Sequence, residues 1–199
     1  MSSRRSHSAD ASEDAELITR LRRGDPIAME HLYDTYFDRI YSLVFNQLGR
    51  DRAAAEDVVQ DTFLAALHSA KGFRGDSSLY TWLCSIAYRK VADFHRRGMR
   101  ESRHRYDVQD IDSIDPEQLS RITTSLPDVA ESVENRELVE KAMSRLPWDY
   151  RQALILKYVE DMSVFEISRV MGRSPKSVEG LLTRARKALR AGQASPVKG

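Results

Sequence analysis

The stretch from 163 to 190, SVFEISRVMGRSPKSVEGLLTRARKALR, limits the possible folds of this chain more than any other. Ser163, with a glutamate three residues later, has the spacing of a capping box before an apolar run. Gly172 follows the last apolar residue of that run, where a left-handed C-terminal residue is favoured. Ser174 and Pro175 then have the residue types of an N-cap and a first helical position. The pattern predicts two helices joined by a tight turn.

The second of these helices has two chemically different faces. Its core-facing stripe is expected to consist of Val178, Leu181, Leu182, Ala185 and Leu189. Residues 173–190 carry six basic residues and one acid, Glu179. A capped helix, a turn with glycine and a helix with a basic outer face predict a helix-turn-helix. From this stretch alone, a surface helix pair with a solvated charged face is the alternative.

Charge is segregated along the 199 residues, although the formal net charge is only +1. Residues 17–100 carry 13 basic and 10 acidic groups, and residues 136–199 carry 13 and seven. Between them, residues 101–135 carry three basic and nine acidic groups. Two basic blocks separated by an acidic one indicate two nucleic-acid-facing modules on a connecting segment that does not bind phosphate.

The composition favours an all-α protein with two small helical domains joined by a flexible acidic linker. Charged residues make up 31% of the chain, with nine Gly and six Pro, which suits helices with short connections. No apolar run approaches about 18 residues and no signal-peptide pattern is present, so we expect a cytoplasmic protein without membrane insertion of its own. The expected divisions are a disordered tail at 1–13, a domain at 14–100, the linker at 101–135, a domain at 136–192 and a tail at 193–199.

Four helices are predicted in the N-terminal block, over 14–23, 26–48, 51–69 and 79–97. Asp25-Pro26 and Asp51 supply N-cap signals, and Gly49 marks the end of the second helix. The apolar face of the second helix is expected to consist of Met29, Leu32, Tyr33, Tyr36, Ile40, Leu43, Val44 and Leu48. In the fourth helix, the expected core residues are Leu79, Leu83, Ile86, Ala87 and Phe94.

The third predicted helix has an acidic outer stripe. Its core side is expected to consist of Val58, Val59, Thr62, Phe63 and Ala66. The other side consists of Asp57, Gln60, Asp61 and Leu64. A leucine exposed beside two carboxylates indicates a protein-docking surface, and a plain solvated face is the alternative.

A loop and the helix after it combine aromatic and basic residues. The loop 71–78 holds two glycines and is expected to present Phe73 and Arg74 outward. One face of the helix is expected to carry Thr81, Ser85, Arg89 and Arg96, with Tyr80, Trp82, Tyr88, Lys90 and Arg97 around them. Rings that stack on unpaired bases and cations that hold phosphates suit single-stranded DNA. The alternative is that Trp82 and Tyr88 simply pack.

The N-terminal block resembles the second conserved region of bacterial sigma factors in three segments: GDPIAMEHLYDTYFDRIYSLV, AAAEDVVQDTFLAAL and FRGDSSLYTWLCSIAYRKVADFHRR. The match is to the small extracytoplasmic-function group, which keeps two globular domains. The fourth region of that family is similar to SRLPWDYRQALILKYVEDMSVFEISRVMGRSPKSVEGLLTRARKALR. The resemblance covers most of the chain, and it implies a factor that directs RNA polymerase to promoters.

The resemblance assigns partners to the N-terminal surfaces. The clamp helices of the β′ subunit of core RNA polymerase would dock on Asp57, Gln60, Asp61 and Leu64. A −10 promoter element, with a base extruded from the non-template strand into a pocket, would be held by Phe73, Arg74, Ser77, Tyr80, Trp82, Ser85, Tyr88, Arg89, Lys90, Arg96 and Arg97. The acidic linker would either enter the polymerase cleft or act as a plain tether.

The resemblance implies that the C-terminal helix-turn-helix reads a −35 element in the major groove. The implied contact set is Arg173, Ser174, Lys176, Ser177, Glu179, Gly180, Thr183, Arg184, Arg186 and Lys187. Its N-terminal residues would meet bases, whereas Arg184, Arg186 and Lys187 would meet phosphates. A helix over 149–158 would support contact with the polymerase β-flap through Leu154, Ile155 and Tyr158. An anti-sigma factor that covers the polymerase-binding faces is a further expected partner.

Catalytic interpretations have little support in the sequence. The five histidines lack paired spacing on one face for a metal, and no glycine-rich phosphate loop follows a strand pattern, so no cofactor is expected. Asp57 and Asp61 resemble an acid/base pair, but no pocket-forming sequence surrounds them. Cys84 is the single cysteine, which excludes an internal disulfide and favours a small core residue.

We therefore expect a two-domain all-α sigma factor that binds core polymerase, recognises −35 and −10 elements and helps to open DNA. It is expected to direct an enzyme and not to be one. The alternative from another class is a sigma-like decoy that sequesters an anti-sigma factor without reading DNA. A decoy has no need of a basic recognition helix, and this chain has one.

Overall fold

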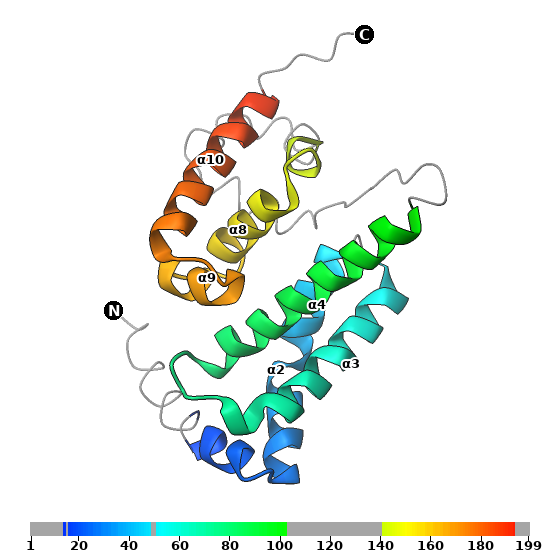
Figure 1. Ribbon diagram of the computed structural model, residues 1–199, viewed down its shortest axis with the longest axis vertical. Coiled ribbons are helices and arrows are strands. Elements are labelled where there is room, and N and C mark those ends of the chain that lie inside the picture. The colour runs from blue at the N-terminus through cyan, green and yellow to red at the C-terminus, as the bar shows by residue number, and fades with distance from the viewer. Residues whose placement is uncertain (1–13, 15, 49–50, 103–140, 194–199) are drawn as a thin grey trace. The chain divides into compact units, whose positions relative to one another are not determined.

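The computed structural model describes residues 14, 16–48, 51–102 and 141–193, except the side chains of 98–102 and 192–193. Every regular element in these residues is helical, which confirms the predicted all-α class (Figure 1). The chain divides into two compact units, Met1–Val108 and Gln109–Gly199. No helix in the described ranges is long and apolar enough to cross a membrane. The predictions for the tails, for Gly49 and for the linker beyond residue 102 lie outside those ranges.

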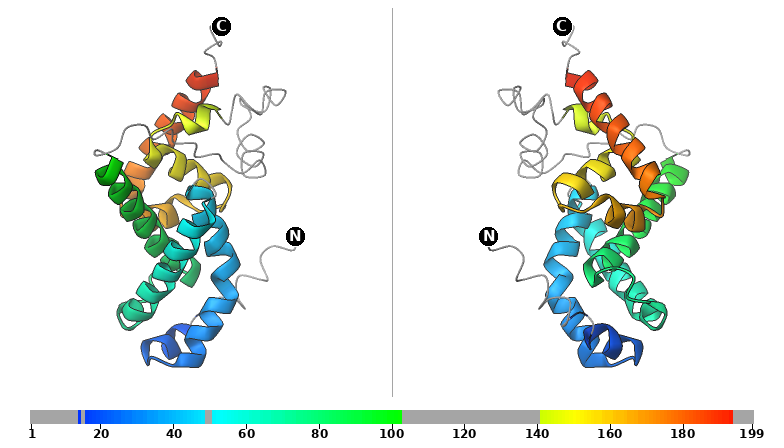
Figure 2. Two further views of the ribbon diagram at one scale, coloured as in Figure 1. Left: turned by 90° about the vertical axis from the view of Figure 1, so that its right-hand side faces the viewer. Right: turned by 90° about the vertical axis from the view of Figure 1, so that its left-hand side faces the viewer.

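The first unit is built on three helices that contact one another: α2 (Pro26–Gln47), α3 (Arg52–Ser69) and α4 (Leu79–Ser102). Figure 2 shows these helices from two further sides. Residues 16–22 form a shorter helix before α2, and a 3-10 turn, η1 (Ala70–Gly72), follows α3. A three-helix contact of this kind gives the unit one apolar core.

The predicted starts of α2 and α3 are confirmed by their N-caps. The Asp25 carboxylate accepts a hydrogen bond from the Ile27 amide at 3.0 Å, and Asp51 accepts from the Ala54 amide at 3.1 Å. The Arg20 Nε also donates to Asp25 at 2.8 Å, and this bond is the main reason that the pKa of the Asp25 carboxyl lies below its usual value. Each aspartate therefore satisfies backbone donors that a helix start leaves without partners.

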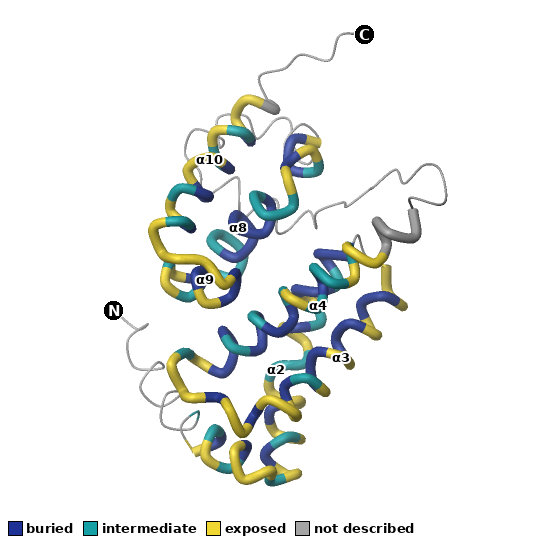
Figure 3. Tube along the Cα trace, viewed as in Figure 1, coloured by how far each residue is buried: buried dark blue, intermediate teal, exposed yellow. Residues whose placement is uncertain are grey.

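Most predicted core positions of the first unit are buried, with two corrections (Figure 3). Tyr33 is 43% exposed, because it lies at the edge of the α2–α3 contact. Phe94 is 41% exposed, and Val91 is the buried residue in that turn of α4. The part of α3 opposite Phe94 presents Asp57 and Asp61 in place of apolar side chains, so the ring has no core to enter. Cys84 is fully buried, as expected for a small core residue.

The second unit contains α8 (Trp148–Tyr158), α9 (Val164–Met171) and α10 (Pro175–Gln193), preceded by helical residues 141–144. Both bonds of the predicted capping box at Ser163 are present at the start of α9. Gly172 ends α9 in the left-handed conformation, with φ of +63°. The Ser174 hydroxyl then accepts from the Ser177 amide at 3.2 Å, which caps α10. The helix-turn-helix is thus formed by the local signals that predicted it.

Candidate functional site

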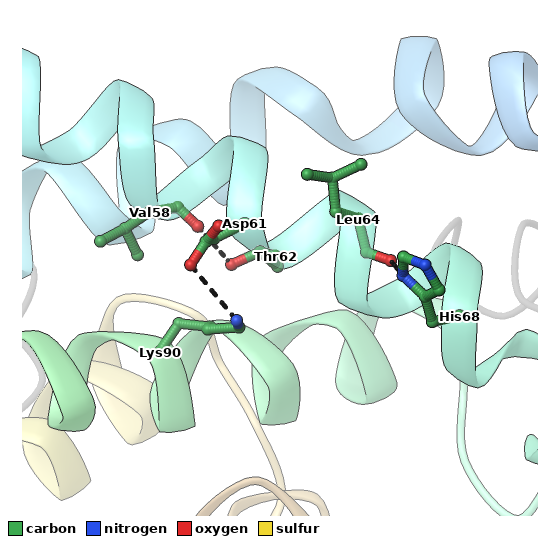
Figure 4. Close-up of polar contacts among 6 residues, drawn as sticks. All are labelled: Val58, Asp61, Thr62, Leu64, His68 and Lys90. Atoms are coloured by element: carbon green, nitrogen blue, oxygen red, sulfur yellow. Dashed lines mark hydrogen bonds and ion pairs between the residues drawn. The ribbon is translucent and has the colours of Figure 1, made fainter.

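The outer face of α3 presents the predicted acidic stripe to solvent. Asp57, Gln60, Asp61 and Leu64 are all exposed, and Leu64 is 48% exposed. The opposite face is buried as predicted, and its one hydroxyl, on Thr62, donates to the Val58 carbonyl at 2.7 Å (Figure 4). α3 therefore has a buried face whose polar group is satisfied within the helix and an opposite face that is open to solvent.

An apolar groove lies beside this stripe, between α2 and α3, and the sequence analysis did not identify it. Its volume is about 530 Å³, and it is lined by Met29, Glu30, Tyr33, Phe37, Glu56, Val59, Gln60, Phe63, Leu64 and Leu67. The rings of Tyr33 and Phe63 lie with centroids 4.9 Å apart, and Leu67 is 44% exposed. Apolar walls with acidic residues at the edge suit a helix that carries apolar and basic side chains.

An ion pair joins the two surfaces that were predicted for different partners. The Lys90 Nζ on α4 lies 3.3 Å from the Asp61 Oδ2 on α3, as Figure 4 shows. The side chains remain 30% and 53% exposed, so the pair stabilises the fold by less than about 1 kcal/mol. Phe94 and Arg97 line a groove of about 460 Å³ beside the pair. A partner that bound Asp61 would compete with Lys90.

The loop before α4 differs from the prediction, because Phe73 does not point outward. Its side chain is only 9% exposed and stacks on Trp82, with centroids 4.6 Å apart and planes 22° apart. The Arg22 Nε donates to the Phe73 carbonyl at 2.7 Å and holds the loop backbone. Stacking removes apolar area of both rings from water. This stabilises the inward position of Phe73 relative to an exposed one. Arg74 is exposed, as predicted.

Two residues of the predicted DNA face of α4 belong to the core. Tyr80 is 8% exposed, and the Arg39 guanidinium lies 3.6 Å from the centre of its ring. Thr81 is 1% exposed, and its hydroxyl lies 2.9 Å from that of Ser78. Both are buried because the start of α4 packs against α2 and the loop.

The remaining residues of that predicted set form a mainly basic surface. Arg74, Arg89, Arg96 and Arg97 are exposed, and Ser77, Trp82, Ser85, Tyr88 and Lys90 are half-buried. Arg89 donates to the Ser85 carbonyl at 3.0 Å, and Arg96 pairs with Asp93 one turn earlier. These contacts hold the cations along α4, so the surface offers more to phosphates than to bases.

The outer face of α10 carries the predicted basic and hydrogen-bonding residues. Arg173, Ser174, Lys176, Glu179, Thr183, Arg184 and Lys187 are exposed, and Ser177, Gly180 and Arg186 are half-buried. The predicted core stripe of α10 is buried throughout. Arg173 forms an ion pair with Asp149 of α8, so it must leave that carboxylate to bind a phosphate.

Two of the three α8 residues predicted to support the β-flap contact are buried, so they would support it from within the fold and not by touching the partner. Leu154 and Ile155 are at most 1% exposed, because α8 packs against both α9 and α10. Tyr158 is half-buried at the end of the helix. α8 therefore forms the base on which the helix-turn-helix rests.

The sequence matches two family models, Sigma-70 region 2 over residues 32–101 and Sigma-70, region 4 over residues 136–189. It is 31% identical to the RNA polymerase sigma-H factor of Pseudomonas aeruginosa, over 89% of this chain and 92% of that protein. It is also 31% identical to the ECF RNA polymerase sigma factor BldN of Streptomyces coelicolor, over 89% of this chain but only 64% of that longer protein.

Solved structures share the fold. CnrH in complex with the cytosolic domain of CnrY is similar with a TM-score of 0.59 and 26% identity, covering 89% of this chain and 95% of that one. The sigma factor RpoE of Bartonella quintana, in complex with the anti-sigma factor NepR, has a TM-score of 0.57 at 19% identity, over 82% and 94%. The second likeness supports the two-domain helical fold alone.

Proposed function

The chain belongs to the extracytoplasmic-function sigma factors of the sigma-70 family, and we propose that it binds core RNA polymerase, recognises −35 and −10 promoter elements, and promotes DNA melting. Sigma factors act in transcription initiation without catalysing a reaction themselves. The observation that carries the proposal is the difference between its two exposed surfaces. One is acidic and apolar, on α3, and the other is basic, on α10.

Polymerase docking is proposed for the outer face of α3 and the groove beside it. Asp57, Gln60 and Asp61 offer acceptors, and Leu64 offers an apolar side chain that borders the groove. A helix bearing arginines and apolar residues, such as a clamp helix of the β′ subunit, complements both features. Leu64 is the main apolar contact in this proposal, because it is 48% exposed and joins the acidic stripe to the groove, so a docked partner would bury it.

Recognition of the −35 element is proposed for α10 entering the major groove. Lys176, Ser177 and Glu179 lie near its N-terminal end, where a recognition helix meets base edges. Glu179 can accept from the N4 amino group of cytosine, so an acid on this face is compatible with base reading. Contacts to phosphates are assigned to Arg173, Arg184, Arg186 and Lys187.

Binding of the −10 element and strand opening are proposed for the loop before α4 and the outer face of α4. The contact residues are those of the predicted set that the structure leaves at the surface. Arg74, Arg89, Arg96 and Arg97 supply cations along one surface. Tyr80 leaves the set because it is buried under Arg39, whereas Trp82 stays as a half-buried ring. A base captured here would have to displace Phe73 from Trp82 or stack beside that pair.

An anti-sigma factor is proposed as a further partner of the polymerase-binding faces. The solved structure of CnrH is a complex with the cytosolic domain of CnrY, and that of the sigma factor RpoE is a complex with the anti-sigma factor NepR. An inhibitor that occupied the α2–α3 groove would exclude polymerase by covering the same residues. The domains are proposed to comprise residues 14–100 and 136–192, and the protein to act in the cytoplasm with the polymerase.

Reconstitution of transcription tests the proposal. The full chain is mixed with purified core polymerase, holoenzyme is isolated by gel filtration, and run-off transcripts are mapped from genomic fragments. We expect a stable holoenzyme and transcripts that start at defined positions. A folded chain that gives no transcript from any fragment contradicts the proposal. Binding to an anti-sigma factor without holoenzyme formation would instead support a decoy.

A further inference from the structure

Gly180 occupies an unexpected place in the recognition helix. It lies in the interior of α10, on the face with Lys176, Thr183 and Arg184, where alanine would stabilise the helix more. Its backbone has no left-handed conformation to explain the choice, unlike Gly24 and Gly172, whose φ angles are positive. A glycine at such a position usually marks a close approach by another group.

The group that approaches Gly180 is the guanidinium of Arg184. A Cβ built on Gly180 would lie 3.3 Å from the Arg184 Nη1 and 3.9 Å from the Cζ and Nη2. Beyond the adjacent residues and the backbone of α10 itself, no other heavy atoms are nearer than these to the added atom. At Gly24, Gly72 and Gly172, the same construction meets open space.

Helix geometry explains the contact. Residues at i and i+4 lie above one another, and helical side chains lean toward the N-terminus, so Arg184 extends over Gly180. Without a Cβ at position 180, the flat guanidinium can lie along the helix backbone. A contact of 3.3 Å is tighter than ordinary van der Waals distance, so a methyl group there would displace the guanidinium by a few tenths of an ångström.

Side chains on either side of Arg184 make their own contacts with the helix backbone. The Thr183 hydroxyl donates to the Glu179 carbonyl at 2.9 Å, on one side of Gly180. Arg186 donates to the Leu182 carbonyl at 3.3 Å and adds a second cation to the next part of the helix surface. The space over Gly180 therefore places the Arg184 guanidinium one turn toward the N-terminus of α10.

We infer that Gly180 is a positioning residue for Arg184, which holds its guanidinium against the recognition helix for contact with a DNA phosphate. The inference rests on the proposed −35 function. It gives Gly180 a role through another side chain and requires no contact between Gly180 and DNA. Pre-ordering matters for arginine because its long side chain otherwise loses rotamer freedom when it binds.

The test compares Gly180→Ala, Arg184→Ala and the double variant, each as holoenzyme. The probe is a pool of duplexes that wild-type holoenzyme selects from a random 30-base-pair library, and affinity is measured by fluorescence anisotropy. We expect Gly180→Ala to weaken DNA binding about threefold while raising the melting temperature of the free chain. A purely structural role for this glycine would raise the melting temperature and leave the affinity for DNA unchanged.

The double variant distinguishes positioning of Arg184 by Gly180 from a direct approach of Gly180 to DNA. We expect Gly180→Ala to have no further effect on affinity in the Arg184→Ala background, because the positioned group is gone. The matched control is a second double variant that combines Gly180→Ala with Lys187→Ala. In it, the fold losses in DNA affinity of the two single variants should multiply. Wild-type affinity in Gly180→Ala, or an equal loss in the Arg184→Ala background, overturns the inference. Failure of wild-type holoenzyme to select any duplex would overturn the proposed function, and this inference with it.

Discussion

The outer faces of α3 and α10 show how one chain builds surfaces for two kinds of partner. On α3, two carboxylates and an exposed leucine border a groove with aromatic walls. On α10, cations and hydroxyls are exposed above a fully apolar stripe, and no large apolar side chain joins them on that face among the described residues. An apolar contact requires a partner of fixed shape, whereas a basic face binds any regularly charged polymer.

The two surfaces should therefore differ in how binding responds to substitution and to salt. Binding at α3 should depend on a few side chains and fall less steeply with salt than binding at α10, because salt does not screen the apolar part of the contact. Binding at α10 should be shared among many cations and fall steeply with salt as counterions are released. Substitutions on α3, α4 and α10 measure this contrast, and a substitution at Ser163 tests the stability of the unit that carries α10.

Leu64→Asp should have the largest effect. It places a third carboxylate in the stripe and removes apolar area at the edge of the groove, so we expect core polymerase affinity to fall about 30-fold, a hot-spot loss. Ile27→Asp is the matched control, because Ile27 is 63% exposed and lines neither groove. The affinity of this variant for core polymerase should stay within about twofold of the wild-type value. Equal losses in both variants, in a gel-shift titration of core polymerase, would contradict a localised docking site.

Arg184→Ala should weaken binding to all −35 duplexes about tenfold and reduce the slope of log affinity against log salt by about 1. Lys176→Ala, nearer the N-terminal end of α10, should change the preferred −35 sequence. Competitive binding to a set of single-base-pair variants measures both. Losses that are equal and independent of sequence in the two variants would show that α10 does not divide phosphate and base contacts in this way.

Ser163→Ala should act on stability alone. Loss of the capping box should cost about 1 kcal/mol and lower the melting temperature of the C-terminal unit by about 4–8 °C. Ser163→Asp keeps a capping oxygen and should retain most of the stability. Circular dichroism on heating measures the melting temperatures. An aspartate variant that melts as early as the alanine variant would contradict the capping role.

Lys90→Met should have the smallest effect and the opposite sign. Removing the ammonium 3.3 Å from Asp61 releases that carboxylate, so affinity for core polymerase should rise about twofold. In an Asp61→Asn background, Lys90→Met should leave the affinity for core polymerase unchanged. Weaker binding in the single variant would mean that Lys90 itself contacts polymerase.

Sequence alone predicted the C-terminal unit more closely than the N-terminal one. The cap at Ser163, the left-handed Gly172 and the cap at Ser174 depend on residues within a few positions of each other, so their chemistry is readable from the chain. The stripe of α3 was predicted for the same reason, since its spacing alone places it opposite a buried face.

The N-terminal predictions that were wrong involve aromatic residues placed by distant parts of the chain. Phe73 is held through its carbonyl by Arg22, and Tyr80 lies under Arg39. An aromatic ring suits either a core or a base-stacking surface, and only tertiary packing decides between them. The α2–α3 groove was missed because it requires two helices together. Phe94 is exposed because of the residues on α3 opposite it.

The stack of Phe73 on Trp82 also makes the loop observable by intrinsic tryptophan fluorescence. The chain has two tryptophans, Trp82 in the first unit and Trp148 in the second, so a Trp148→Phe variant leaves one emitter beside this loop. Indole emission shifts when a covering ring leaves and water or a nucleobase replaces it. A stopped-flow trace of that emission, recorded as the free variant is mixed with single-stranded DNA, would then report whether the stack opens, without an attached dye.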